Sequence, residues 1–193
     1  MRTARYVLWG LAVAALALVG WFRVIQPMFE TSVADTIGHG DYALETTDGP
    51  AFTEDSLSGQ PTAVFFGFTH CPEVCPTTLG DIATWQEELG ADGPLKVYFI
   101  TVDPERDPVD TLREYVSWVP GVTGVSGTPE ELEKAISAFR IYARKVPTSD
   151  GSYTMDHSAN VLLFDSRGRF FEPIGYQEGY DRAVAKIRRL MEG

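Results

Sequence analysis

The stretch FFGFTHCPEVCPTT, residues 65–78, decides the fold and holds the only two cysteines of the chain, Cys71 and Cys75. It begins inside the apolar run TAVFFGFT, residues 62–69, and such a run is typical of a strand that is covered on both faces. From Pro76 onward, apolar residues recur at helical spacing. The cysteines are therefore expected where a parallel strand passes into a helix, and open α/β sheets place their sites in such loops.

Further strands are expected on both sides of this stretch. One is a second apolar run, and the others form two hairpins, each around a turn that contains glycine. They cover residues 95–103, residues 41–52 around the Asp48-Gly49 turn, and residues 159–165 with 169–174 around the Ser166-Arg167-Gly168 turn.

Helix-start signals complete the pattern. Asp107-Pro108 and Thr128-Pro129 each combine a capping residue with a proline suited to the first helical turn. A last helix is expected through the apolar positions from Ala183 to Met191. Because strands alternate with helices early and pair as a hairpin late, residues 41–193 are predicted to form a thioredoxin-like α/β domain, a mixed sheet with flanking helices.

The charge of the chain excludes one class of partner. It has 16 basic and 27 acidic residues, a net charge of −11, and three arginines precede every acidic residue. Residues 24–193 therefore hold 13 basic and 27 acidic groups, a net charge of −14. A domain of this charge repels nucleic acid and anionic lipid, and it attracts cations or cationic partners.

The N-terminal segment is uncharged from Tyr6 to Phe22. As a helix this run is roughly 25 Å long, and the apolar residues after Arg23 extend it to about 30 Å if the arginine reaches outward. We therefore predict one transmembrane helix, with a membrane anchor over residues 1–25 and a linker over residues 26–40.

The orientation of this anchor follows from its flanking charges. Arg2, Arg5 and the amino terminus outnumber Arg23, so the domain is predicted on the periplasmic side of the inner (cytoplasmic) membrane. The alternative is a cleaved signal peptide. The small-residue site Ser32-Val33-Ala34 lies too far beyond the apolar run for ordinary cleavage, which favours the uncleaved anchor.

Three roles are open for the cysteine pair: a structural disulfide, a redox couple or a metal clamp. A disulfide that closes so short a loop contributes about 2 kcal/mol, which a domain of this size hardly needs. If the segment is helical, residues four apart share one face, near a helix N-terminus that lowers thiol pKa values. Two convergent thiolates suit a soft metal such as Cu(I).

The three histidines are the candidates for a further ligand. His39 lies between glycines and is expected to be solvated. His70 directly precedes Cys71, so in an extended segment its side chain points away from that sulfur. His157 stands at the entry to a predicted central strand, where it could face the cysteines, and its spacing leaves a ligand role and a structural role equally open.

Three blocks together resemble a known family. GFTHCPEVCPTTL, TVDPERDP and DHSANVLLFD, which occur in this order, look like the signature blocks of the Sco/SenC copper proteins, which assist cytochrome c oxidase assembly. The resemblance covers roughly residues 40–190 and includes the single N-terminal anchor. It implies a thioredoxin-like fold in which Cys71, Cys75 and His157 hold Cu(I) or Cu(II).

The resemblance also implies a function and partners. Family members are implicated in building the dinuclear copper centre of oxidase subunit II, so the subunit II copper domain, a copper donor and a thiol reductant are the expected partners. The expected function is that of a metal carrier. The alternative is a thiol–disulfide oxidoreductase that reduces the cysteines of that copper site.

The spacing of the cysteines bears on the rival activities. Dedicated dithiol catalysts such as thioredoxin use Cys-x-x-Cys, whereas three residues intervene here. VCPTT is similar to a peroxiredoxin phrase, but residues Phe68 and Pro72 stand where that pattern requires proline and threonine. Peroxidase activity is therefore not expected.

Acidic residues cluster beside the predicted site. Asp103, Glu105 and Asp107 follow a central strand, and we expect a solvated capping loop there, with a rim that docks a partner as the functional alternative. Asp156 adjoins His157, but strand alternation directs its side chain to the opposite face, so it is not expected to be a ligand.

Overall fold

The computed structural model describes residues 2–21, 23, 33–90 and 95–192, in two units that cover residues 1–33 and 34–193. The first unit contains α1 (Arg2–Gly20). Among the described residues, no helix is long and apolar enough to cross a membrane. The predicted transmembrane helix is thus not found there. Residues 1, 22, 24 and 25 of the predicted anchor and residues 26–32 of the predicted linker lie outside the described residues.

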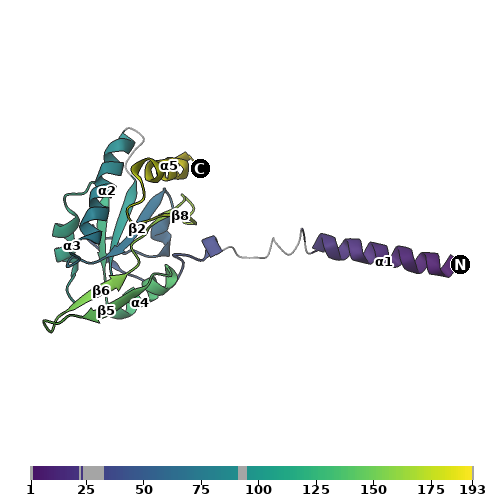
Figure 1. Ribbon diagram of the computed structural model, residues 1–193, viewed down its shortest axis with the longest axis horizontal. Helices are drawn as coiled ribbons and strands as arrows, with labels where there is room; N and C mark the ends of the chain where they lie inside the picture. Colours follow the sequence, from purple (N-terminus) through teal and green to yellow (C-terminus); the bar gives the residue numbers. More distant parts are fainter. Residues whose placement is uncertain (1, 22, 24–32, 91–94, 193) are drawn as a thin grey trace. The chain divides into compact units, whose positions relative to one another are not determined.

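The second unit is built on a six-stranded mixed sheet with the strand order β1-β4-β3-β2-β7-β8 (Figure 1). The strands β4, β3 and β2 are parallel to one another. β1 is antiparallel to β4, β7 is antiparallel to β2, and β8 is antiparallel to β7. The strands are β1 (Glu45–Thr46), β2 (Thr62–Gly67), β3 (Lys96–Thr101), β4 (Val122–Ser126), β7 (Val161–Phe164) and β8 (Phe170–Ile174). This arrangement confirms the predicted fold class.

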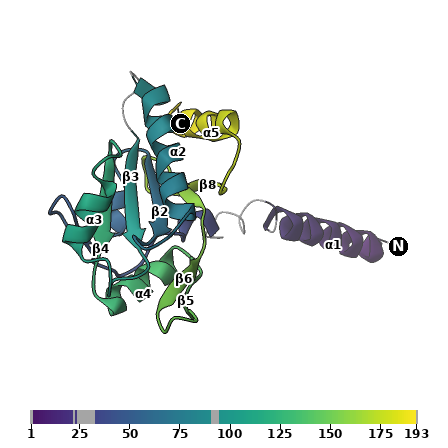
Figure 2. The same cartoon turned by 60° about the vertical axis from the view of Figure 1, so that its left-hand side comes forward.

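Helices flank the sheet, as Figure 2 shows from a second side. They are α2 (Val74–Leu89), α3 (Val109–Val116), α4 (Pro129–Ala138) and α5 (Tyr180–Glu192), with short 3-10 helices η3 (Val33–Asp35) and η4 (Glu54–Leu57). Thr128 caps α4 as predicted, because its hydroxyl accepts the amide hydrogen of Glu131 at 3.3 Å.

The predicted cap of α3 is wrong. Pro108, not Asp107, is the N-cap residue, and no side chain caps this helix. The Asp107 side chain is fully buried and instead accepts hydrogen bonds from the Thr69 amide, the Thr69 hydroxyl and the Thr101 hydroxyl. The carboxylate therefore ties the end of β2 to the end of β3, which holds the two loops at this edge of the sheet together.

Aromatic rings fill the core on both faces of the sheet. On the face that carries α2, Phe65 and Phe99 are paired across β2 and β3, with ring centroids 5.7 Å apart. On the opposite face, Phe139 at the end of α4 packs against Phe66 at 5.2 Å and Phe164 at 5.7 Å. Every residue of β2 is buried, as its apolar sequence predicts.

One predicted hairpin is confirmed, and the other takes a different form. β7 and β8 pair as expected, whereas residues 41–52 form a single antiparallel bridge between Leu44 and Phe52, and Thr46 pairs with β4 instead. Gly49 in the predicted turn has a φ of 105°, which only glycine adopts without strain.

A third hairpin was not predicted. β5 (Ala143–Pro147) and β6 (Tyr153–His157) form a separate two-stranded antiparallel sheet, visible below the main sheet in Figure 1. The hairpin carries His157, and the chain then continues within a few residues into β7.

Candidate metal centre

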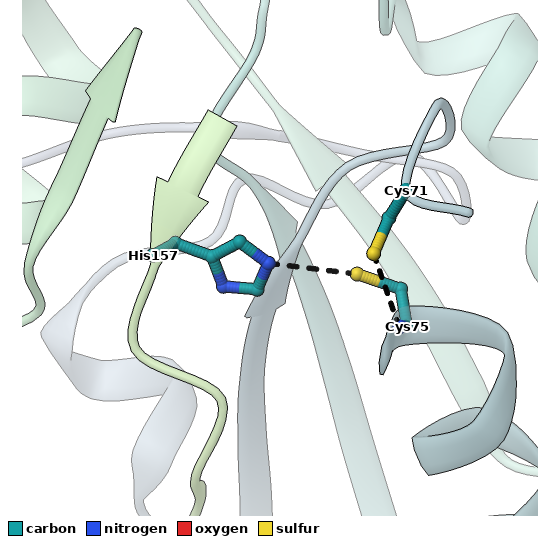
Figure 3. Close-up of side chains that lie close together, drawn as sticks. All are labelled: Cys71, Cys75 and His157. Atoms are coloured by element: carbon teal, nitrogen blue, oxygen red, sulfur yellow. Dashed lines mark hydrogen bonds between the residues drawn. The ribbon is translucent and has the colours of Figure 1, made fainter. Parts of the chain in front are cut away.

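Three side chains converge at the edge of the sheet where β2 ends and β7 begins (Figure 3). The ligand atoms of Cys71, Cys75 and His157 all lie within 4.8 Å of one another, and this is the only such group of histidine, cysteine or acidic residues among the described residues. The Cys75 sulfur lies 3.7 Å from Nε2 of His157. Both cysteines are free thiols.

The two cysteines do not lie on one face of a helix, as their spacing of four residues would allow. Cys75 is the second residue of α2, but Cys71 precedes the helix in a turn that its amide closes on the Phe68 carbonyl at 3.2 Å. The Cys75 amide, one of the first-turn groups that a helix leaves without an internal partner, donates to the Cys71 sulfur at 3.3 Å. The sulfurs therefore meet across the helix N-terminus rather than along one helical face.

Space for the buried sulfur depends on a glycine. A Cβ atom at Gly67, the last residue of β2, would lie 2.8 Å from the Cys75 sulfur and 2.7 Å from the Phe99 ring. Both distances are shorter than van der Waals contact allows. A residue with a side chain at this position would displace the Cys75 sulfur from the cluster.

The imidazole of His157 is oriented by its own backbone. Nδ1 lies 2.9 Å from the Ser158 carbonyl oxygen, and because a carbonyl only accepts, Nδ1 carries the hydrogen. Nε2, which faces Cys75, therefore holds the free lone pair. The Phe68 ring packs edge-on against the imidazole, with centroids 5.7 Å apart. The hydrogen bond from Nδ1 to a backbone carbonyl is the usual way in which a metal-binding histidine is fixed in one tautomer.

The environment makes the two thiols unequal. The pKa of Cys71 is lowered to about 4, chiefly by the hydrogen bond from the Cys75 side chain, with smaller contributions from the backbone amides of Glu73 and Cys75. The pKa of Cys75 is raised, first by that same bond and then by burial. At neutral pH the half-buried Cys71 is a thiolate, and the buried Cys75 keeps its proton.

This donor set fits a copper ion. Thiolate sulfurs are soft ligands suited to Cu(I), and an imidazole nitrogen suits both copper states. The structure brings together the three residues that the sequence nominated, and it leaves the other histidines outside. His70 is more than half exposed, with Nδ1 3.0 Å from the Thr69 hydroxyl, and His39 lies 3.6 Å from a Glu54 carboxylate oxygen.

The acidic loop after β3 is neither a solvated cap nor an acidic rim. Asp103 and Asp107 are fully buried, and the exposed Glu105 is paired with Lys145 at 2.6 Å. The docking role expected as an alternative therefore fails for the two aspartates, because their carboxylates are inaccessible. Asp156 is exposed and does not belong to the cluster, as predicted.

A thioredoxin-like domain that gathers two thiols and an imidazole at one sheet edge defines a class, the metal-binding proteins of the thioredoxin fold. Residues 30–192 match the SCO1/SenC family model, and the chain belongs to this family.

Solved structures of relatives agree with this assignment. Bradyrhizobium japonicum ScoI with copper bound is 45% identical, with a TM-score of 0.72 over 80% of this chain and 99% of that one. Yeast Sco1 with copper bound is 33% identical, with a TM-score of 0.74 over 82% of this chain and 90% of that one.

Curated relatives are longer than this chain. The mitochondrial SCO2 protein of Saccharomyces cerevisiae is 33% identical over 160 residues, which cover 79% of this chain and 52% of the relative. The chain thus spans about half the length of that protein.

We expect the two thiols to differ in reactivity. With a pKa of about 4, Cys71 should be alkylated by iodoacetamide at a rate that hardly changes between about pH 6 and pH 8, whereas Cys75 should react far more slowly. Peptide mass spectrometry after timed quenching measures both rates. Free cysteine, with a pKa of about 8.5, is the control and should gain roughly tenfold per pH unit. A Cys71 rate that rises equally steeply would contradict the assignment.

Gly67→Ala should weaken metal binding by about tenfold or more, because the added methyl group moves the Cys75 sulfur. Competition titration with a colorimetric Cu(I) chelator measures the change. Gly80→Ala is the matched control: Gly80 lies in α2 with no atom near its Cβ position, so its affinity should equal that of the wild type. Equal affinities for all three proteins would show that the glycine does not shape the site.

Proposed function

We propose that this protein is a copper-binding assembly factor that delivers copper to, or prepares, the dinuclear copper centre of cytochrome c oxidase subunit II. The observation that carries the proposal is the cluster of Cys71, Cys75 and His157, with their ligand atoms within 4.8 Å. The copper-bound state of two relatives supports the choice of metal. The Sco family is one of cytochrome c oxidase assembly proteins, which supports the choice of partner.

Loading begins at the exposed side of the site. The Cys71 thiolate is half-buried and already ionised, so it is the first protein ligand for an arriving Cu(I) ion, which is cargo for this protein. Cys75 then releases its proton as the ion displaces its hydrogen bond to Cys71. Nε2 of His157 completes the set without losing a proton, since its lone pair is free.

Copper leaves the site on the side at which it enters, next to Cys71. The Cys75 sulfur is buried beneath the Cys71 turn, so an incoming thiolate from a partner reaches the ion past Cys71. Copper can then pass from one sulfur to the next without being free in solution, because each step exchanges one thiolate for another. The net negative charge of the domain favours a cationic partner surface.

The ligand set predicts how single substitutions act. The wild type should bind one copper per chain, and Cys71→Ala or Cys75→Ala should abolish tight binding of both oxidation states. His157→Ala should lower the Cu(II) affinity more than the Cu(I) affinity, because Cu(II) favours nitrogen ligands. Anaerobic Cu(I) titration and the visible thiolate–Cu(II) absorption measure these effects.

The control for these variants is His70→Ala, since His70 lies next to Cys71 in the chain but outside the cluster. It should keep the absorption band and the affinity of the wild type. Tight stoichiometric binding by either cysteine variant would refute the ligand set. Copper transfer is then tested by mixing the loaded protein with the copper-free subunit II domain.

The unequal thiols favour one alternative function, reduction of a disulfide in the subunit II copper site. The Cys71 thiolate would attack one partner sulfur and release the other as a thiolate. Cys75, after passing its proton to that departing thiolate, would then attack the Cys71 sulfur and release the second partner sulfur as a thiolate. This oxidises Cys71 and Cys75 to a disulfide, which a separate thiol reductant must reduce. Thiol counts on both proteins after mixing, without copper, test this alternative: two thiols lost here and two gained there would support it.

We also propose that the N-terminal segment attaches the protein to the inner membrane, with the domain on the periplasmic side. The proposal rests on the uncharged run from Tyr6 to Phe22, which continues beyond the end of α1. The full chain should then stay with membranes after washing with alkaline carbonate, and protease should digest the domain only from the outer side. Recovery of a soluble species that begins at Asp35 would establish a cleaved leader instead.

A further inference from the structure

The hairpin that carries His157 is joined to the domain mainly by side chains. β5 and β6 pair with each other, from Ala143 with His157 to Pro147 with Tyr153, and with no strand of the main sheet. The position of the imidazole therefore depends on what holds the far end of β6.

That far end is held by Arg106, in the loop after β3. Its Nη1 donates to the Tyr153 carbonyl at 3.0 Å, and the guanidinium carbon lies 3.9 Å from the centroid of the Tyr153 ring. Its Nε donates to the fully buried Asp103 carboxylate, which also accepts the Tyr153 hydroxyl at 2.8 Å. We call these three residues, Arg106, Asp103 and Tyr153, the Arg106 clamp.

The clamp and the metal centre lie on the same face of β6. Side chains alternate along a strand, so Tyr153, Met155 and His157 point to one side, and Met155 packs against the core. Phe68 connects the two ends: its ring centroid lies 5.9 Å from the Arg106 guanidinium carbon and 5.7 Å from the imidazole centroid. Tyr153 and His157 lie four residues apart along β6, a distance of roughly 13 Å at about 3.3 Å per residue. A small tilt of the strand at Tyr153 therefore displaces the imidazole at its other end.

We propose that Arg106 and Tyr153 are positioning residues for His157, and that the Arg106 clamp determines how tightly the imidazole coordinates copper. The inference rests on the proposed function, in which His157 is a copper ligand. The clamp touches no ligand atom, so it acts through the placement of β6 and through the Phe68 ring between Arg106 and the imidazole. It should affect Cu(II) more than Cu(I), because two thiolates alone already satisfy Cu(I).

The contacts that Lys145 makes with Tyr153 and Glu105 are not part of the Arg106 clamp. Lys145 lies 4.6 Å from the Tyr153 ring centroid and 2.6 Å from a Glu105 carboxylate oxygen, but both charged side chains are largely exposed. Exposed ion pairs hold a strand weakly. Lys145→Gln should therefore leave copper binding unchanged, although Lys145 contacts the same tyrosine.

Arg106→Gln is the first test. The Cu(II) affinity should fall about 10- to 100-fold, as is typical when a group that orients a metal ligand is lost, while the Cu(I) affinity changes less than about threefold. The thiolate–Cu(II) absorption band should also shift. Arg188→Gln is the matched control, because the same substitution removes a surface ion pair between Arg188 of α5 and Glu88 of α2. A wild-type Cu(II) affinity for Arg106→Gln would overturn the inference.

The double variant Arg106→Gln/His157→Ala separates positioning from a general loss of structure. If the clamp acts through His157, Arg106→Gln should cause no further loss of Cu(II) affinity in the His157→Ala background. The full loss in that background would overturn the inference. If His157→Ala itself had no effect, the proposed ligand set would fail instead, so the two failures are distinguishable.

Arg106→Gln leaves the buried Asp103 carboxylate without its cation, so this variant can fail to fold. In that case Tyr153→Phe provides the test. The phenylalanine keeps the ring beneath the guanidinium and removes only the hydroxyl, with its bond to Asp103 and its longer bond to the exposed Glu105. We expect a Cu(II) affinity reduced severalfold, with the thermal unfolding midpoint followed in parallel. An unchanged Cu(II) affinity and absorption band in folded Tyr153→Phe would overturn the inference.

Discussion

The antiparallel pairing of β7 with β2 is the constraint on which the candidate site depends. In this register Phe65 lies opposite Val161, so the chain enters β7 at the same sheet edge at which it leaves β2. The cysteine turn follows β2, and His157 precedes β7. A parallel β7 would place the imidazole at the opposite edge. Within β7, the Phe164 ring packs against Phe139 and Phe170, and a slip by one residue would turn this ring away from Phe139.

Around this edge, the two buried carboxylates both have hydrogen-bond partners. The Asp107 carboxylate joins the ends of β2 and β3, and the Asp103 carboxylate joins the loop after β3 to the hairpin. These buried carboxylates hold the two segments that carry the cysteines and the histidine. The acidic character of the loop thus serves the geometry of the site rather than its charge, and the reactivity of the site resides in the difference between a half-buried thiolate and a buried thiol.

Much of the fold follows from local sequence. The strands β2 and β3 are predicted from their continuous apolar runs, because burial on both faces requires apolar residues at successive positions. The start of α4 is predicted from Thr128, because a capping residue lies within a few residues of the helix that it caps. The β5–β6 hairpin leaves no such mark, since exposed Arg144 and Lys145 interrupt its apolar pattern. The burial of Asp103 and Asp107 could not be predicted, because Tyr153 and Thr69, which donate to these carboxylates, lie in distant segments. His157 could be nominated by its place before a strand and by family resemblance, but the clamp that orients it has no local signal.

The separation of the ligands along the chain has a consequence for folding. Cys75 and His157 are 82 residues apart, and they meet only after β7 has docked beside β2. Such distant contacts form late, because closing a long loop costs entropy before any contact is gained. A nascent or unfolded chain therefore offers two thiols but no three-ligand site. Copper taken up with the full ligand set reports that the whole sheet is assembled, so the site doubles as a check on completed folding.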